Sequence, residues 1–358
     1  MTPAVAPLTV EAPASGGVLE ITTTASEQAW DRFVHMHPDA SGYHTWKWRR
    51  VFEEAFGHDT VYLSAHQDGE IVGVLPLVVF RSPLFGRFGV SLPFVNYGGV
   101  CARDVTVARA LAEAAVRIAA ERRLSHIELR HTTRQRPDLP ARQHKVGMYL
   151  ALERDAGRAW EGLDRKVRNQ VRKAEKSGLT ARSGGKELLS RFYDVFARNM
   201  RDLGTPVYSI RFFERVASTF PDTSRVFLVD HGDVTVAAGI VLAHRNVLEV
   251  PWASSLREYR SQCPNNLLYW RIIEHAIEAG HATLDFGRST PNEGTYQFKQ
   301  QWGAQPQPLH WEYLLRGRAD VPNLSPANPR FRSAVKIWSR LPLSITNWIG
   351  PHIVRSIP

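Results

Sequence analysis

The order of the hydrophobic segments occurs twice along the chain, and this repeat constrains the fold more than any other feature. In each half, two apolar runs flank a polar turn (Gln67-Asp68-Gly69, then His231-Gly232-Asp233), and a helix-like segment and a short apolar run follow. The first part of this pattern is typical of a β-hairpin, and the 3.6-residue periodicity after it is typical of a helix. The repeat predicts a mixed α/β (α+β) chain with two tandem units, each with a mixed sheet. The predicted elements are strands 61–65, 71–80, 127–130, 226–228, 234–243, 247–250 and 284–286 and helices 105–122 and 264–279.

Chain length agrees with two cores. The chain has 358 residues, of which 43% are hydrophobic, whereas a single core stops growing at roughly 250 to 300 residues. The longest apolar run, Ile71–Phe80, is far shorter than the ~20 residues of a spanning helix. The N-terminus lacks the basic and apolar regions of a secretory signal. We therefore expect a cytoplasmic protein.

Five segments follow from these patterns. Residues 1–17 are rich in Ala, Pro, Gly and Ser, a composition that predicts disorder. The other predicted segments are an N-terminal domain (18–152), a basic amphipathic connecting segment (153–186), a C-terminal domain (187–318) and a basic tail (319–358).

The connecting segment carries much of the basic excess. Residues 154–186 contain ten Lys and Arg against four acidic residues, in a chain of net charge +10. Its apolar residues from Trp160 to Ala174 share one helical stripe, and Arg168 and Arg172 point elsewhere. The cationic ridge is either a solvated helix face or a site for an anionic partner.

The tail has no acidic residue beyond Asp320 and alternates Arg and Lys with apolar residues and Trp. Such a segment either lies on an anionic bilayer or docks on its own domain.

Most common catalytic signatures are absent. The chain has no Walker loop, no G-x-G-x-x-G, no G-x-S-x-G and no H-E-x-x-H motif. Its two cysteines and scattered histidines predict neither a disulfide framework nor a metal site.

Two features of the second half remain as candidate sites. Pro264 suits the first position of a helix, whose first turn, with Asn265, Asn266 and the preceding Arg260, could bind a phosphate or serve only as an ordinary cap. The predicted strand 284–286 ends in a run of polar residues, so that alternation places Asp285 opposite its apolar neighbours.

Lys299 follows that polar run and is the only lysine between Lys186 and Lys336 in a chain that otherwise favours arginine. This choice indicates either a need for a compact point charge or an ordinary solvated lysine.

Four motifs together resemble the FemAB family. They are residues 91–100 (SLPFVNYGGV), 166–174 (KVRNQVRKA), 285–290 (DFGRST) and 298–303 (FKQQWG). The resemblance covers about residues 20–316, and the branch it resembles most is associated with exosortase/PEP-CTERM exopolysaccharide systems. It implies two tandem GNAT-like domains.

The resemblance also implies acyl transfer to an amine. The donor would be an acyl-CoA or an aminoacyl-tRNA, with no tightly bound cofactor, and the acceptor a cell-envelope or exopolysaccharide precursor. By the family motif, Lys299 would stabilise the oxyanion, and Asp285 and Glu293 are candidate bases by their chemistry. The candidate substrate-binding residues are Arg288, Ser289, Tyr296, Arg260, Asn265, Asn266, Tyr97, Arg168 and Arg172.

Two functions stay open on this evidence. One is an N-acyltransferase that contacts the membrane peripherally through its tail. The alternative is a non-catalytic GNAT-like protein that binds an anionic saccharide or organises the enzymes of an exopolysaccharide pathway at the membrane.

Overall fold

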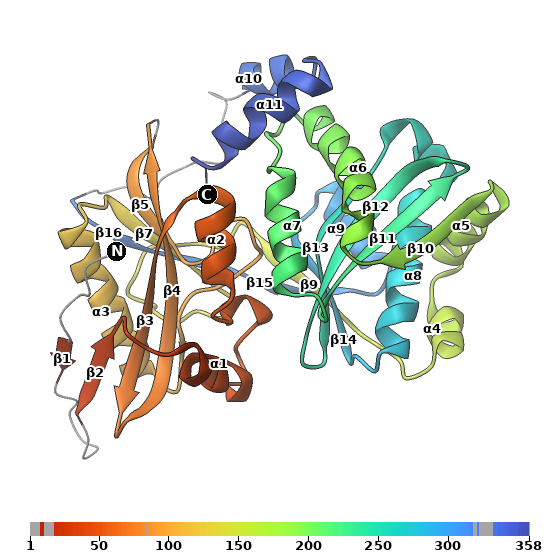
Figure 1. The fold of residues 1–358 in the computed structure, drawn as a ribbon. Coiled ribbons are helices and arrows are strands. Elements are labelled where there is room, and N and C mark those ends of the chain that lie inside the picture. The colour runs from red at the N-terminus through yellow and green to blue at the C-terminus, as the bar shows by residue number, and fades with distance from the viewer. Residues whose placement is uncertain (1–7, 11–17, 84, 318–320, 322–331, 358) are drawn as a thin grey trace. The chain divides into compact units, whose positions relative to one another are not determined.

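The computed structural model describes residues 8–10, 18–83, 85–317, 321 and 332–357 (Figure 1). The chain divides into two compact units, each with its own sheet. The first unit comprises residues 1–144, 308–322 and 356–358, and the second comprises residues 145–307 and 323–355. No helix in the described ranges combines the length and the apolar character needed to cross a bilayer.

The first unit is built on a sheet with the order β1-β2-β3-β4-β5-β7-β16-β8, and β6 pairs with β4. Neighbouring strands are antiparallel except β5 and β7, which are parallel and are connected through α3. The strands are β1 (Leu8–Val10), β2 (Leu19–Thr22), β3 (Asp59–Gln67), β4 (Glu70–Ser82), β5 (Gly86–Val90), β6 (Cys101–Ala102), β7 (His126–His131), β8 (Ala141–Arg142) and β16 (His310–Leu315).

Helices cover both faces of this sheet. The Ala-rich α3 buries one stripe against Leu63 and Leu75 of the β3–β4 hairpin. On the other face, Trp30 of α1 contacts Tyr62, with ring centroids 5.0 Å apart. The helices are α1 (Glu27–Met36), the 3₁₀ turn η1 (Gly42–His44), α2 (Trp48–Phe56) and α3 (Val105–Glu121).

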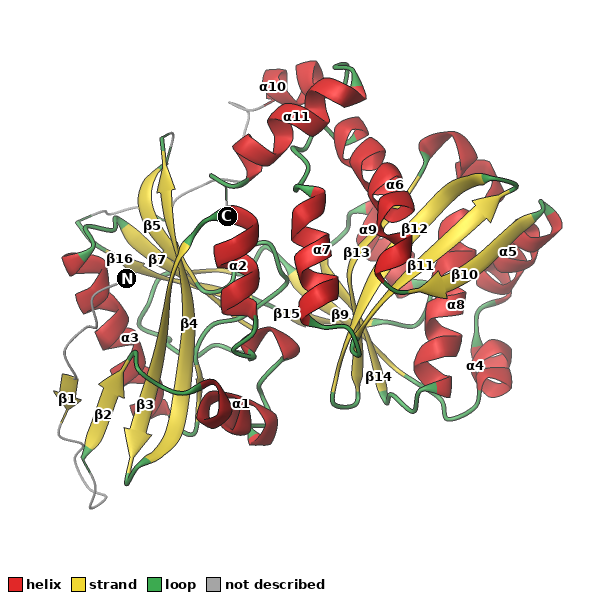
Figure 2. Ribbon diagram, viewed as in Figure 1, coloured by secondary structure: helices red, strands yellow, loops and turns green. Residues whose placement is uncertain are grey.

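The second unit repeats this plan with a sheet of order β10-β11-β12-β13-β14-β9-β15. Here β13 and β14 form the parallel pair, connected through α8, as a parallel pair requires a crossover (Figure 2). The strands are β9 (Val146–Ala151), β10 (Leu179–Gly184), β11 (Ser224–His231), β12 (Val234–His244), β13 (Val247–Ser255), β14 (Thr283–Ser289) and β15 (Gln305–Pro308).

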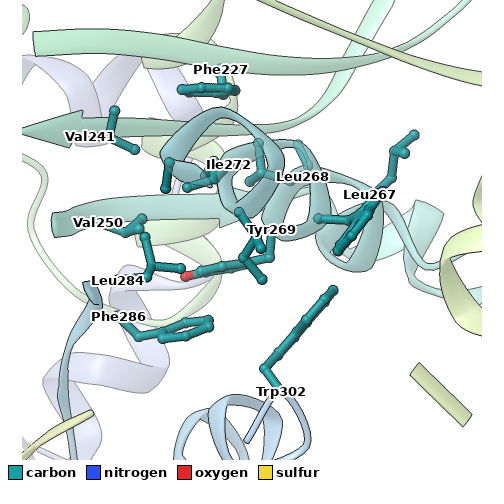
Figure 3. Close-up of a cluster of buried hydrophobic side chains, with 14 of the residues drawn as sticks. Phe227, Val241, Val250, Leu267, Leu268, Tyr269, Ile272, Leu284, Phe286 and Trp302 are labelled. Carbon is teal, nitrogen blue, oxygen red and sulfur yellow. The ribbon is translucent and has the colours of Figure 1, made fainter. Parts of the chain in front are cut away.

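The core of the second unit lies between its sheet and α8. Figure 3 shows Leu268 and Ile272 of α8 among Phe227, Val241 and other side chains of the strands. The opposite face of the sheet packs on α6 and α7, where Trp252 contacts Phe212 and Phe213. The helices of this unit are α4 (Ala156–Gly162), α5 (Arg165–Lys176), the 3₁₀ turn η2 (Lys186–Leu188), α6 (Leu189–Asp202), α7 (Ile210–Thr219), the 3₁₀ turn η3 (Arg257–Gln262), α8 (Pro264–Glu278), α9 (Gly294–Gln300), α10 (Arg332–Trp338) and α11 (Leu343–Val354).

These elements confirm the predicted fold class. Each unit has a hairpin, a long helix and a strand in the order that the repeat predicts, around a mixed sheet.

The boundaries of the two units differ from those of the predicted segments. Strand β9 precedes residue 152, yet it pairs with β14 of the second sheet, whereas β16 follows most of the second unit and pairs with β7 of the first. Within the predicted N-terminal tail, Leu8–Val10 pair with β2; the rest of residues 1–17 lies outside the described residues.

The basic connecting segment is part of the second unit rather than a separate linker. Its predicted single stripe is divided between α4 and α5, because Leu163 is extended and the Asp164 carboxylate caps α5 by accepting from the Lys166 N–H at 2.6 Å. Val167, Val171 and Ala174 are buried in the core of the second unit.

Candidate active site

The two parallel strands of the second unit separate at one point, and this point defines the candidate site. Pairing between β13 and β14 runs from Val247 and Thr283 to Glu249 and Asp285. Beyond Glu249, the described part of β13 passes through an irregularity and stays paired with β12. The β13–β14 ladder therefore ends at Glu249 and Asp285, and the two strands diverge beyond this pair.

A row of acidic and phenolic side chains crosses the sheet at this point. Glu249 lies opposite Asp285, which lies opposite Tyr149 of β9. Residues in register share one face of a sheet, so these three side chains point to the same side. Glu249 is 8% exposed and Asp285 is 2% exposed. Two buried acidic residues are therefore cross-strand neighbours where the strands diverge.

Burial perturbs the ionisation of this row. Loss of hydration raises the pKa of Asp285 to about 7, against the opposing effects of the Gly287 N–H and the Lys299 charge. The Gly287 N–H donates to Asp285 Oδ1 at 2.7 Å. Burial and the nearby Glu249 raise the pKa of Tyr149 above its usual range. Asp285 is thus a carboxyl group that can exchange a proton near neutral pH.

A bulge in β14 brings Lys299 to the carboxyl pair. The register with β9 shifts between Asp285 and Arg288, and Gly287 has φ = 72°, a conformation that favours glycine. Lys299 Nζ, on α9, donates to the carbonyl of Arg288 at 2.8 Å and to that of Gly287 at 3.3 Å. Its side chain is buried, and burial lowers the pKa of Lys299 to about 8. The sequence alternative of a solvated lysine is therefore wrong.

More polar groups continue along β14. Ser289 is buried, and its Oγ has no hydrogen-bond partner among the described residues. The next hydroxyl, Thr290 Oγ1, accepts from Lys145 Nζ at 2.6 Å, and burial lowers the pKa of Lys145. Arg288 is half-buried.

A second group of candidates lies around the start of α8. Cys263 is left-handed (φ = 59°), and Pro264 then begins the helix. Asn266 Nδ2 donates to Gln170 Oε1 of α5 at 3.1 Å, whereas the buried Asn265 Oδ1 has no partner in the described structure. Arg260 is exposed. The predicted phosphate-binding turn and the predicted cationic helix are therefore neighbours.

Grooves line the outer side of α5. One of about 500 Å³ is lined by Arg165, Lys166, Asn169, Gln170 and Lys173, together with the N-capping aspartate. Another, of about 430 Å³, shares Lys166 and reaches the end of α9. The two meet at Asp164 and Lys166, and most of the charged residues that line them are basic.

The remaining predicted site residues are more scattered. Glu293 is exposed at the N-cap position of α9, without a side-chain capping hydrogen bond, and Tyr296 packs against the core. Arg172 is exposed over the Trp160 ring, at 5.4 Å, and the buried Arg168 Nε has no partner among the described groups. Tyr97 is buried in the first unit.

Sequence reasoning missed Glu249, Tyr149 and Lys145. The signal for Glu249 is the one that selected Asp285, a single carboxylate within an apolar strand, and it is present in Val247–Val250. Tyr149 and Lys145 offer no such signal, because their neighbours on β14 follow only from strand pairing.

At the equivalent position of the first unit, the acidic side chain is already bonded to its neighbours. Glu128 of β7 lies opposite Val90 of β5 and Tyr313 of β16. Its carboxylate accepts from Arg130 Nε at 2.7 Å and from the Tyr313 hydroxyl at 2.9 Å. A valine thus occupies the place of Glu249, and an arginine neutralises the remaining acid.

Comparison with known proteins identifies the fold of this site. Residues 163–300 match the family described as the acetyltransferase (GNAT) domain. No curated protein matches the chain. The matched domain contains the divergent strands, α8 and Lys299, and the predicted acyltransferase is confirmed at this level.

Solved structures share the two-unit architecture. FemX is similar with a TM-score of 0.62 and 16% identity, over 80% of this chain and 96% of FemX. A tandem GNAT protein from the clavulanic acid biosynthesis pathway gives 0.54 and 13%, over 84% of this chain and 100% of that one. The C-terminal domain of a protein assigned as lysylphosphatidylglycerol synthetase, from Agrobacterium fabrum, gives 0.54 and 10%, over 81% and 91%. At these identities the likeness shows the fold.

Proposed function

We propose that the second unit transfers an acyl or aminoacyl group to an amine of a cell-envelope or exopolysaccharide precursor. The observation that carries this proposal is the buried Glu249–Asp285 pair beside Lys299, at the divergence of two strands in a GNAT domain. The FemAB-like motifs support an acceptor of this class, including one from an exosortase/PEP-CTERM pathway.

The carboxyl pair would act as the general base. The amine nitrogen attacks the acyl carbonyl carbon, and the proton lost from nitrogen passes to the pair. A base works best when its pKa lies near the working pH, and burial raises the pKa of Asp285 to about 7. Glu249, the neighbour of Asp285 across the strand pair, would orient the amine or receive its proton in turn.

Lys299 would stabilise the negative charge on the carbonyl oxygen in the tetrahedral intermediate. Its ammonium is already held by two carbonyls, so little reorganisation is needed during the reaction. Collapse of the intermediate breaks the bond to the donor and forms an amide. The leaving thiolate or alkoxide then takes up the proton that the carboxyl group received from the amine, which restores the base.

The donor would be an acyl-CoA or an aminoacyl-tRNA, bound as a substrate rather than held as a tight cofactor. Both carry phosphates, and the start of α8 with the cationic α5 offers complementary charge. Donor-binding roles are proposed for Arg260, Asn265, Asn266, Arg168 and Arg172.

The residues around the β14 bulge would bind the acceptor or orient the acyl group. We assign this role to Arg288, Ser289 and Tyr296 and keep Glu293 as a surface candidate for proton transfer. Tyr97, in the first unit, is proposed to contact substrate on the FemAB-like motif alone.

An acceptor carried on a lipid would require a cytoplasmic enzyme to contact the membrane peripherally. The synthetase from A. fabrum named above concerns a lipid, phosphatidylglycerol, which supports this class of acceptor. Within the second unit, the contact would come from the C-terminal helices.

The experiment has two steps. Native mass spectrometry of the full chain with CoA thioesters, aminoacyl-tRNAs and nucleotide sugars identifies a donor and an acceptor, and turnover is then measured with that pair. Glu249→Gln and Asp285→Asn should each lower kcat by roughly 10²-fold or more. The matched control is Glu128→Gln, which removes the equivalent carboxylate of the first unit and should reduce stability but not turnover per folded molecule. Full turnover in both second-unit variants would exclude these carboxyl groups as the base, and ligand binding by the wild type without any turnover would favour the alternative of a non-catalytic binding or scaffold protein.

A further inference from the structure

The C-terminal helices present apolar side chains to solvent. Trp348 of α11 is 73% exposed, Ile337 of α10 is 63% exposed and Ile345 of α11 is 39% exposed. Ile345 and Trp348 are three residues apart and share one helical face. Exposed apolar groups that cluster in this way mark interaction surfaces more often than isolated ones do.

The opposite side of these helices is already used for packing on the second unit. Thr346, Gly350 and Val354 are spaced four residues apart and are buried. Gly350 lies so close to Val207 that an added Cβ would come within 3.0 Å of the Val207 N atom. Val335 of α10 contacts Gly204 in the same loop between α6 and α7. The α11 helix is therefore anchored against α6 (Figure 1), whereas Trp348 and Ile337 stay exposed.

The C-terminal segment itself carries charge of one sign. Residues 321–358 contain five Lys and Arg and no acidic residue. Lys336, Arg340 and Arg355 are exposed on the described helices. A protein partner would have to be acidic and apolar together, whereas an anionic bilayer presents phosphates above hydrocarbon, with an interfacial region that suits Trp.

We propose that Ile337, Ile345 and Trp348, with Lys336 and Arg340, form a surface that docks reversibly on an anionic phospholipid bilayer. The α11 helix has 12 residues, a length of about 18 Å, which is well short of the ~30 Å hydrocarbon core. The helices therefore lie in the interface, where Trp and Ile enter the headgroup boundary and the basic side chains meet phosphates. This inference names the residues that make the membrane contact in the proposed function. It does not depend on the acyl-transfer reaction.

The test is co-sedimentation of the full-length protein with vesicles of phosphatidylcholine alone or with phosphatidylglycerol, at low and physiological salt. We expect binding only to the anionic vesicles, weakening as salt rises. Trp348→Ala/Ile337→Ser should reduce the affinity at least tenfold, and Lys336→Glu/Arg340→Glu should abolish the preference for phosphatidylglycerol.

The matched control is Arg32→Glu/Met36→Ser on α1 of the first unit. Both side chains are exposed, and that of Met36 is 76% exposed. As in the tail variants, the two substitutions lower the net charge and remove exposed apolar area. This variant should bind like the wild type.

Three results would overturn the proposal. They are no binding of the wild type at low salt, equal loss in the control variant, and unchanged binding after both tail changes. A dimer detected by light scattering that Trp348→Ala dissociates, without vesicle binding, would assign the surface to self-association instead. Because vesicle binding needs no substrate, it can fail while acyl transfer succeeds, and the reverse.

Discussion

Asp285 and Glu128 occupy equivalent strand positions, and their different neighbours give them different chemistry. Each lies opposite a tyrosine from the strand on one side. The Glu128 carboxylate is bonded to Arg130, whereas burial raises the pKa of Asp285 to about 7 and the residue opposite it on β13 is a second acid, Glu249. Perturbed groups of the latter kind are typical of functional sites, while satisfied ion pairs are typical of structure.

These ionisations predict a bell-shaped pH dependence of kcat/KM. The base must be unprotonated, so activity should fall as the pH falls below about 7, the pKa of Asp285. The ammonium of Lys299 must be charged, so activity should also fall as the pH rises above about 8. Rates measured from pH 5.5 to 9.5 should therefore peak between these values. Asp285→Asn should remove the acidic limb, and an unchanged limb in that variant would exclude Asp285 as the base.

Lys299→Met tests the cation directly. Loss of one oxyanion donor should lower kcat by roughly 10²- to 10³-fold with donor affinity largely retained. The carbonyls of Gly287 and Arg288 would also lose a donor, so a stability loss of about 1–3 kcal/mol is expected. Lys299→Arg should rescue poorly, since a planar fork does not replace a compact ammonium. Thermal melts and turnover per folded molecule separate the two effects, and normal turnover would make Lys299 purely structural.

At the scale of elements, the β14 bulge connects backbone conformation to catalysis. The bulge turns two carbonyls toward Lys299 and lets the Gly287 N–H reach Asp285. The bulge needs Gly287 in the left-handed backbone conformation, which destabilises the fold by roughly 1 kcal/mol or more when the residue has a side chain.

Gly287→Ala should therefore lower both stability and turnover. Gly280→Ala is the matched control, because Gly280 has a similar φ of 78° and no atom within 4 Å of an added Cβ. We expect both variants to lose about 1 kcal/mol in denaturant unfolding and only Gly287→Ala to lose kcat. Equal turnover in the two variants would show that the bulge is not needed for the reaction.

The α5 helix combines a buried apolar stripe with a cationic outer face. Arg168→Glu/Arg172→Glu/Lys173→Glu should weaken binding of CoA or tRNA and flatten its salt dependence between 50 and 200 mM salt. Reversal of three exposed arginines of the first unit, Arg32, Arg87 and Arg123, matches the change in net charge and should have little effect. Identical affinities for the two triple variants would leave α5 as a solvated helix face.

At the scale of the molecule, each unit completes its sheet with a strand from a distant part of the chain. Strand β9 separates β14 from β15, and β16 separates β7 from β8. A boundary drawn after residue 152 would remove β9 from the second sheet and expose one edge of β14.

Two fragments test this division. A fragment of residues 145–358 should fold its second-unit core, whereas residues 153–358, which lack β9, should show reduced helix and sheet content and aggregate through the open β14 edge. Circular dichroism and size-exclusion chromatography measure the difference. Equally folded fragments would support the boundary predicted from sequence.

The amino-acid sequence by itself determined the repeated order of hairpin, helix and strand and the two mixed sheets, because periodicity and turn residues act locally. The GNAT-type acyltransferase class followed from the motifs that resemble the FemAB family. It also selected Asp285 and Lys299. Glu249, Tyr149 and Lys145 became part of the site only through tertiary structure. Strand pairing is non-local: whether β14 pairs with β9 is decided by the burial of whole faces, and the sequence between the two strands carries no signal for it. The same holds for Lys299, whose burial against two bulge carbonyls distinguishes it from a surface lysine.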